Sequence, residues 1–361
     1  MPVLTGRRAI SKIQAALDEH EADAALLTAL PDIRWACGFT GSNGVLIVFR
    51  DEALFLSDGR YEVQANEEVE GAEIHIPGYK IFEYIEDESL LERADRVAFQ
   101  SDHVSVATLQ SWKERFGHVA WVPVASMMDR QVARKSAEQV EKMRRAQRTT
   151  EAVFEHILGV IEPDVTEREV AAEVVYQHMK RGADKVSFDP IVASGPRGAL
   201  PHARSTDKEI RRGDMIVLDM GGVQDGYVSD MTRTVAVGDP GEEARAVYDL
   251  VLEAQEAALE AARAGMPADE LDAVARDIIE QAGHEEHFGH GLGHGIGLQI
   301  KEWPRVSYHV DYELPARASV TIEPGVYLPD RFGVRIEDTI VLREDGCDNL
   351  TQAPKGELIT L

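Results

Sequence analysis

The chain has 361 residues, 44% hydrophobic and 28% charged, enough for two buried cores at roughly 150 residues per domain. Its 64 acidic residues against 38 basic ones give a net charge of -26, which excludes a nucleic-acid backbone as the expected partner. No stretch has the ~20 uncharged apolar residues of a membrane helix, and the first residues have no signal-peptide core, so we expect a cytoplasmic protein with no membrane partner.

The first 130 residues predict a small α/β domain. Apolar periodicity and turn residues predict helices over residues 10–17 and 106–116. They also predict strands over residues 24–27, 97–99 and 119–122, and a two-stranded hairpin of residues 44–49 and 53–56. Histidines, cysteines and carboxylates do not cluster in this part as they would in a catalytic site. We therefore expect the chemistry to lie in the remainder of the chain.

The residue pattern changes after residue 130, and residues 131–361 are predicted to form a second domain. Ser-Ala-Glu-Gln at 136–139 and Thr-Glu-Arg-Glu at 166–169 both have the pattern of a capping box, which starts a helix. Four helices are expected, over residues 137–160, 167–181, 244–264 and 268–282.

Two aspartates follow or precede predicted strands of this second domain. The apolar run 215–218 ends in Asp219, which is followed by two glycines. Asp230 precedes an alternating run that fits an antiparallel return strand. Such a hairpin brings the two carboxylates together, where they repel each other unless a divalent cation lies between them. The alternative is a pair of turn aspartates on the surface.

A glycine-rich segment supplies histidines. Residues 290–298 place His290 and His294 among four glycines, which let the backbone approach a site closely. A phosphate-binding loop is the alternative, but that motif needs a strand-to-helix context. Glu323 and Glu337 each end or interrupt an apolar strand run. Four carboxylates and one imidazole favour manganese, cobalt or iron over structural zinc.

These residues carry a resemblance to a known family. The order Asp219, Asp230, His294, Glu323 and Glu337, in the settings LDMGG, SDMTRT, HGLGHGIGL, TIEPGVY and VRIEDT, resembles the pita-bread metallopeptidases, and among them the Xaa-Pro enzymes prolidase and aminopeptidase P. The resemblance covers the whole chain.

The resemblance implies an α+β protein of two domains. Residues 1–130 would form a creatinase/prolidase-like α/β domain, which the sequence Asp-Gly-Arg-Tyr at 58–61 supports more loosely. Residues 131–361 would form a pita-bread catalytic domain, a curved antiparallel sheet backed by helices.

The resemblance also implies a ligand set for two divalent metal ions. Asp219 would bind one ion, His294 and Glu323 would bind the other, and Asp230 and Glu337 would bridge both. Manganese is the expected metal, with cobalt, zinc or iron as alternatives. A hydroxide held between the two ions would attack the amide, as in other two-metal peptidases.

Further roles follow from the same resemblance. Glu323 would also carry a proton from the water to the leaving nitrogen. His202, in Leu-Pro-His-Ala-Arg, matches a histidine that contacts the substrate backbone, and His290 matches one on the proline-binding side. Tyr327 and Arg335 match residues that support the ligands and the developing charge. For both histidines the alternative is a partly buried structural role.

One position departs from the family pattern. Lys301 occupies a place where family members usually have a histidine that donates a hydrogen bond to a substrate carbonyl. A lysine still donates, but it does not exchange protons readily near neutral pH. We interpret Lys301 as a working substitute.

The sequence thus predicts a metal-dependent exopeptidase that cleaves the Xaa-Pro bond in dipeptides or at the N-terminus of peptides. Proline has a tertiary amide without an N–H, which explains a dedicated enzyme. The alternatives are a creatinase-like amidinohydrolase, which works without metal, and a non-catalytic peptide-binding module, which usually loses ligands. The resemblance suggests a homodimer, and it leaves the choice between dipeptidase and aminopeptidase P open.

Two further features bear on the environment of the protein. Cys37 and Cys347 lie far apart without CxxC spacing and are expected to be reduced thiols. The acidic excess is spread along the chain, which fits either general solubility or adaptation to high salt, where screening removes self-repulsion. Thermal melts across a KCl series would separate these two explanations.

Overall fold

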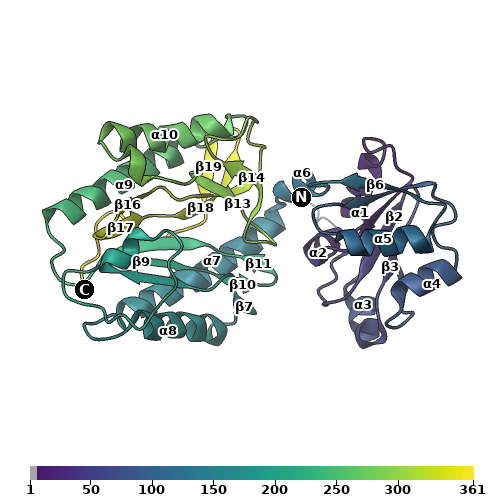
Figure 1. The fold of residues 1–361 in the computed structure, drawn as a ribbon, viewed down its shortest axis with the longest axis horizontal. Coiled ribbons are helices and arrows are strands. Elements are labelled where there is room, and N and C mark those ends of the chain that lie inside the picture. Colours follow the sequence, from purple (N-terminus) through teal and green to yellow (C-terminus); the bar gives the residue numbers. More distant parts are fainter. Residues whose placement is uncertain (1–5) are drawn as a thin grey trace. The chain divides into compact units, whose positions relative to one another are not determined.

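The computed structural model describes residues 6–361, which form two compact units that divide after Val132 (Figure 1). Each unit is described by itself below. In the described residues, no helix combines the length and the apolar character needed to cross a membrane.

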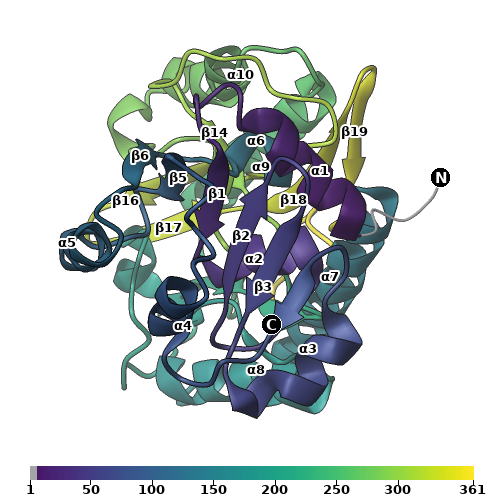
Figure 2. The ribbon, with the colours of Figure 1, turned by 90° about the vertical axis from the view of Figure 1, so that its right-hand side faces the viewer.

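The N-terminal unit is built on a mixed six-stranded sheet with the strand order β4-β3-β2-β1-β5-β6. The strands are β1 (Ala24–Leu27), β2 (Val45–Phe49), β3 (Ala53–Leu56), β4 (Glu73–His75), β5 (Arg96–Gln100) and β6 (Ala120–Val124). β1 pairs antiparallel with β2 and parallel with β5, and Figure 2 shows β1, β2 and β3 side by side. The sheet residues Leu26, Ile47, Leu56 and Phe99 belong to the buried core of this unit.

Short helices precede, connect and follow the strands of this unit. They are α1 (Gly6–Ala16), α2 (Leu30–Cys37), η1 (Gly59–Tyr61), α3 (Glu62–Glu68), α4 (Ile81–Asp87), α5 (Val106–Arg115) and α6 (Asp129–Ala133). The helices predicted at 10–17 and 106–116 and the predicted strands are confirmed. Helix α2 was not among the predicted elements. Pro31 lies in the first turn of α2, where the N–H that proline lacks has no helical partner in any case.

The C-terminal unit contains the four predicted long helices, α7 (Ala137–Leu158), α8 (Glu167–Lys180), α9 (Glu242–Ala261) and α10 (Ala268–Gln281). Both predicted capping boxes form, with Ser136 and Thr166 as the cap residues. Helix α9 ends three residues earlier than predicted, because the backbone is already extended at Ala262.

The strands of this unit form antiparallel ladders. They are β7 (Lys185–Val186), β8 (Ile191–Ser194), β9 (Met215–Met220), β10 (Gly222–Gln224), β11 (Tyr227–Val228), β12 (Met231–Ala236), β13 (Gly293–Gly295), β14 (Glu302–Val306), β15 (Ser319–Ile322), β16 (Gly325–Leu328), β17 (Phe332–Arg335), β18 (Asp338–Arg343) and β19 (Gly346–Asn349). The two largest sheets have the orders β12-β9-β8 and β14-β13-β15-β18-β19.

Helices cover these sheets from two sides. In Figure 1, α9 and α10 lie on one side of the strands and α7 and α8 lie on the other. One core cluster joins α9 and α10 to β15, β16 and β18, and a second joins α7 and α8 to β8, β9 and β12. The α+β layout predicted for this part is therefore confirmed.

Candidate metal centre

The five predicted metal ligands lie at the ends of strands in the C-terminal unit. Asp219 is on β9, and Asp230 directly precedes β12, which pairs antiparallel with β9 so that Thr232 faces Asp219. His294 is on β13, Glu323 follows β15, and Glu337 lies between β17 and β18. The predicted return strand after Asp219 thus forms, although a small hairpin of β10 and β11 intervenes.

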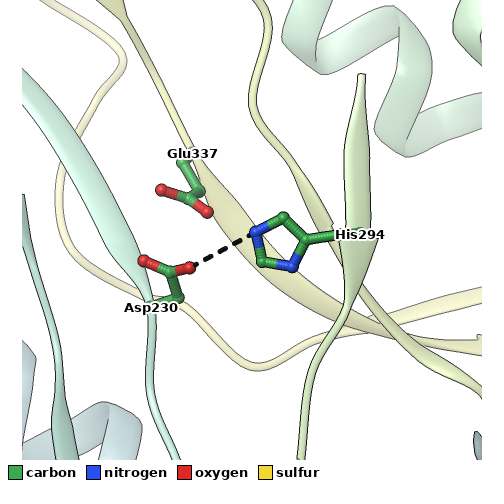
Figure 3. Close-up of side chains that lie close together, drawn as sticks. All are labelled: Asp230, His294 and Glu337. Atoms are coloured by element: carbon green, nitrogen blue, oxygen red, sulfur yellow. Dashed lines mark ion pairs between the residues drawn. The ribbon is translucent and has the colours of Figure 1, made fainter. Parts of the chain in front are cut away.

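Three of the side chains converge closely. Ligand atoms of Asp230, His294 and Glu337 lie within 4.8 Å of one another, and Figure 3 shows the three side chains pointing toward a common space. His294 Nε2 is 3.7 Å from Asp230 Oδ2 and 3.4 Å from Glu323 Oε1. The imidazole therefore faces two carboxylates, one directly before β12 and one directly after β15.

The orientation of His294 is fixed by the backbone. His294 Nδ1 lies 3.0 Å from the carbonyl oxygen of Gly295, which can only accept, so Nδ1 carries the proton. Nε2 is left as the acceptor that faces Asp230 and Glu323. This is the tautomer that a metal-binding histidine needs.

Two threonines hold the ligand carboxylates. Thr232 Oγ1 donates to Glu337 Oε2 at 2.7 Å, and Thr321 Oγ1 donates to Glu323 Oε1 at 2.9 Å. Thr321 also accepts a hydrogen bond from the backbone N–H of His294. Thr232 therefore leaves Glu337 Oε1 for the centre, whereas the Glu323 oxygen that Thr321 holds is also the oxygen that faces His294.

Two ligand oxygens lack protein partners. Asp219 Oδ1 and Glu337 Oε1 are buried and have no hydrogen-bond partner among the described residues. Buried polar atoms are normally paired, so these atoms need a partner from outside the chain. A cation would supply one.

The electrostatics of the carboxylates lead to the same conclusion. Burial, followed by repulsion from neighbouring carboxylates, raises the pKa of Asp230 and of Glu337 well above the usual range. Burial also raises the pKa of Asp219, although Arg335 opposes it. A divalent cation removes this repulsion, and a set of four carboxylates and one imidazole suits such an ion. The residues present therefore fit the metal centre that the sequence predicts.

A hydrogen-bonded chain leads away from the ligands. Arg335 Nη2 donates to Asp219 Oδ2 at 2.6 Å, and Arg335 Nη1 donates to the Tyr327 hydroxyl at 2.9 Å. The Tyr327 hydroxyl is 3.0 Å from His290 Nε2, and His290 Nδ1 is 2.9 Å from the carbonyl of Gly291. His290 Nδ1 therefore carries the proton, and the hydroxyl of Tyr327 donates to Nε2. Burial lowers the pKa of His290, so the ring is neutral.

Comparison with known proteins identifies the family. Residues 141–344 match metallopeptidase family M24, and residues 9–131 match the creatinase/prolidase N-terminal domain. The chain belongs to metallopeptidase family M24.

Similar proteins cover the whole chain. An Xaa-Pro dipeptidase of Pyrococcus furiosus is 36% identical over 96% of this chain and 98% of its own length. The solved structure of an Xaa-Pro dipeptidase from Bacillus anthracis superimposes with a TM-score of 0.96 at 37% identity, covering 99% of this chain and 100% of that one. An X-Pro aminopeptidase from Thermotoga maritima superimposes with a TM-score of 0.90 at 35% identity, covering 96% and 100%.

The metallopeptidase has a cleft of about 940 Å³ around the five ligands. The structure brings all ten residues singled out from the sequence to the walls of this cleft: His202, Asp219, Asp230, His290, His294, Lys301, Glu323, Tyr327, Arg335 and Glu337. His202 lies on an exposed turn after η2 (Gly195–Ala199), and the preceding Pro201 carbonyl accepts from Arg335.

Sequence patterns did not indicate several residues that organise the cleft. The threonines that hold the ligands are two examples, and a buried pair on α10 is another. Asp272 accepts from Arg276 and from the backbone N–H of Leu292, while Arg276 donates to the carbonyl of His290. This pair fixes the segment that leads from His290 to His294. The Asp272–Arg276 spacing is typical of any exposed helical ion pair, so the sequence held no specific signal.

Proposed function

We propose that this M24 metallopeptidase is an Xaa-Pro dipeptidase with two divalent metal ions, manganese being the favoured metal. The observation that supports the proposal is that all five predicted ligand side chains line one cleft with His202 and His290, three of them grouped closely and two with unpartnered buried oxygens. Relatives named Xaa-Pro dipeptidase match nearly the full length of the chain.

Asp219, Asp230, His294, Glu323 and Glu337 would hold the metal ions, as the sequence predicts. When bound, such ions lower the pKa of water and stabilise negative charge on an attacked carbonyl oxygen. The oxygen-rich donor set supports manganese.

Glu323 would carry the proton that the attacking water loses. Burial opposes its ionisation, but the electrostatic surroundings, with Arg335 and the hydrogen bond from Thr321 among them, lower the pKa of Glu323, so the group is ionised and can accept a proton. Thr321 donates to Oε1 and so holds the carboxylate in one orientation. Glu323 would take a proton from the attacking water and deliver it to the proline nitrogen, which must be protonated before it leaves.

The cleft walls support a substrate with proline in the second position. His290 is neutral and its Nε2 is engaged by Tyr327, so it offers an apolar ring face that suits a proline side chain. His202, on the turn after η2, has an exposed imidazole that would donate to the substrate backbone.

Unpaired cations support a dipeptide in particular. Lys301 and Arg305 both line the cleft, and neither side chain has an ion-pair partner within residues 6–361. In a chain with a net charge of -26, two free cations beside a peptidase centre suit a substrate carboxylate. A dipeptide places its terminal carboxylate directly after proline, whereas a longer peptide has a neutral amide there.

We also propose a cytoplasmic homodimer. The dimer is supported by the family resemblance. The location is supported by two free cysteines, one of which, Cys37, is buried with its pKa raised to about 11 and is therefore inert.

The test is hydrolysis of an Xaa-Pro dipeptide and of the matching Xaa-Pro-Yaa tripeptide by chelated protein, with and without added manganese or cobalt, at low and high KCl. Metal-restored cleavage of the dipeptide is expected, with an Xaa-Ala dipeptide as the control that is not cleaved. Cleavage of the tripeptide alone would mean an aminopeptidase P. Metal binding without any cleavage would favour the peptide-binding alternative, and amidine hydrolysis by chelated protein would favour the creatinase-like one.

A further inference from the structure

A buried ion pair lies behind one wall of the cleft. Lys135 Nζ is 2.6 Å from Glu302 Oε2, and the two side chains are only 2% and 4% exposed. The residues are 167 positions apart, so the pair ties the segment before α7 to the start of β14. Neither residue was indicated by the sequence motifs.

The second oxygen of Glu302 closes a turn. Glu302 Oε1 accepts from the backbone N–H of Leu298 at 2.7 Å and from that of Gln299 at 3.0 Å. The carboxylate therefore binds the turn on one side and the Lys135 ammonium on the other.

Gly297 packs closely against this ion pair. A Cβ atom at Gly297 would lie 2.6 Å from Lys135 Nζ and 2.7 Å from Glu302 Oε2. A side chain at this position would therefore have to displace the ends of the two paired side chains.

The turn that Glu302 closes forms part of the cleft. Ile300 and Lys301, which directly precede Glu302, both line it. On the other side, Glu302 begins β14, where it faces Gly295, and Arg305 of the same strand faces the ligand His294. In the chain, Glu302 thus lies between Lys301 and Arg305, two cations of the cleft without an ion-pair partner among the described residues.

We propose that Lys135 and Glu302 are positioning residues that hold the Ile300–Lys301 wall and so set the affinity for the carboxylate end of the substrate. This inference rests on the proposed function. A buried ion pair contributes little net stability, since the desolvation of both charges offsets their attraction. What this pair supplies is the fixed geometry of the turn, which an apolar pair of similar volume cannot supply because it has no acceptor for the two N–H groups.

The test is the double variant Lys135→Met/Glu302→Leu, which removes both charges together and avoids an unpaired buried charge. Its Tm should fall only modestly, since two hydrogen bonds to the turn are lost but no unpaired buried charge is left. The KM for an Xaa-Pro dipeptide should rise about tenfold, the equivalent of one lost charge-assisted hydrogen bond, while kcat changes less than about twofold. Hydrogen exchange should accelerate at the amides of Leu298 and Gln299.

A double-mutant cycle with Lys301 tests whether the ion pair affects KM through that lysine. In a Lys301→Met background the same double variant should raise KM no further, because the cation that the wall presents is already gone. The matched control is His156→Met/Glu173→Leu, a half-buried pair at 2.8 Å between α7 and α8 whose residues do not line the cleft. It should leave KM unchanged.

Three results would overturn the inference. One is faster exchange at 298 and 299 with an unchanged KM, and another is a KM increase that persists in full without Lys301. The third is a fall in kcat together with weaker manganese binding in calorimetry, which would mean that the pair acts on His294 instead. If the wild type binds the dipeptide without cleaving it, calorimetry on chelated protein gives dissociation constants, and these replace KM in the same comparisons. A wild type that neither binds nor cleaves would refute the proposed function and this inference together, whereas a failure of the inference alone leaves wild-type cleavage intact.

Discussion

The guanidinium of Arg335 lies 2.6 Å from Asp219 Oδ2, although the two residues are 116 positions apart in the chain. Their side chains are 4% and 14% exposed. Arg335 occupies one carboxylate oxygen, and the other, Asp219 Oδ1, is buried without a hydrogen-bond partner among the described residues. The same guanidinium donates to Tyr327 and to the Pro201 carbonyl before His202. One side chain therefore connects a predicted metal ligand with Tyr327 and with the turn that bears His202, which both line the cleft.

Replacement of Arg335 should weaken metal binding and catalysis together. In Arg335→Gln we expect manganese affinity to fall about 10–100-fold, the usual cost of losing a partner that orients a ligand. kcat/KM should fall at least as much, because Tyr327 and the His202 turn also lose a donor. Calorimetric manganese titration and steady-state kinetics check this. Arg331→Gln, at an exposed pair with Glu243, is the matched control and should match the wild type. An unchanged manganese affinity in Arg335→Gln would contradict the prediction.

Thr232 should act through a single hydroxyl. Thr232→Val keeps the shape of the side chain but leaves Glu337 Oε2 without its donor, so we expect about tenfold weaker manganese binding. Thr234→Val, two residues along β12, loses only bonds to the backbone of Arg335 and serves as the control. Both variants should lose a similar amount of stability, about 1 kcal/mol. Equal manganese affinities in the two variants would show that the Thr232 hydroxyl does not orient Glu337.

The difference between Thr232 and Asp219 shows what sequence patterns can carry. Asp219 was found because a buried strand ends beside it, and the strand pairing with 231–236 follows from local alternation. The helix starts at Ser136 and Thr166 are equally local, since each cap bonds within four residues. Thr232 contacts Glu337 across 105 residues, and nothing near it in the sequence differs from an ordinary strand threonine. Long-range partners are set by how the sheets pack, which periodicity does not encode.

Removal of metal should destabilise the protein at neutral pH. Without a cation, the buried carboxylates Asp230 and Glu337 must either repel each other or hold protons against their usual pKa. Manganese at about 100 times its dissociation constant should therefore stabilise the folded chain by about 2.7 kcal/mol. Calorimetric melts of chelated protein with increasing manganese measure this. A Tm that does not change with manganese would mean that the five side chains bind no such ion.

Acidification should destabilise the fold through His178. This buried histidine contacts the Thr150 hydroxyl at 3.0 Å, and burial lowers its pKa. Below a pH of about 6.5 the unfolded chain binds a proton that the native chain does not, so stability falls as the pH falls.

The slope attributable to His178 is at most about 1.4 kcal/mol per pH unit. In His178→Gln the metal-loaded protein should be less stable at neutral pH but should lose less stability between about pH 6.5 and about pH 5. Denaturant unfolding at several pH values checks this. His103→Gln, at an exposed histidine, should keep the wild-type slope.

Lys301 should be replaceable by histidine at moderate cost. Both side chains donate a hydrogen bond, but the lysine also adds a full charge to the cleft that Arg305 lines as well, so Lys301→His should raise the KM for a dipeptide. The change in kcat/KM should stay within about tenfold, since it corresponds to one hydrogen bond or less. The ratio of kcat/KM for Xaa-Pro and Xaa-Pro-Yaa should shift toward the tripeptide, which has no carboxylate at that position. A hundredfold gain in kcat/KM on the dipeptide would mean that the natural site is tuned to another substrate, because the wild-type lysine would then be an obstacle rather than a substitute.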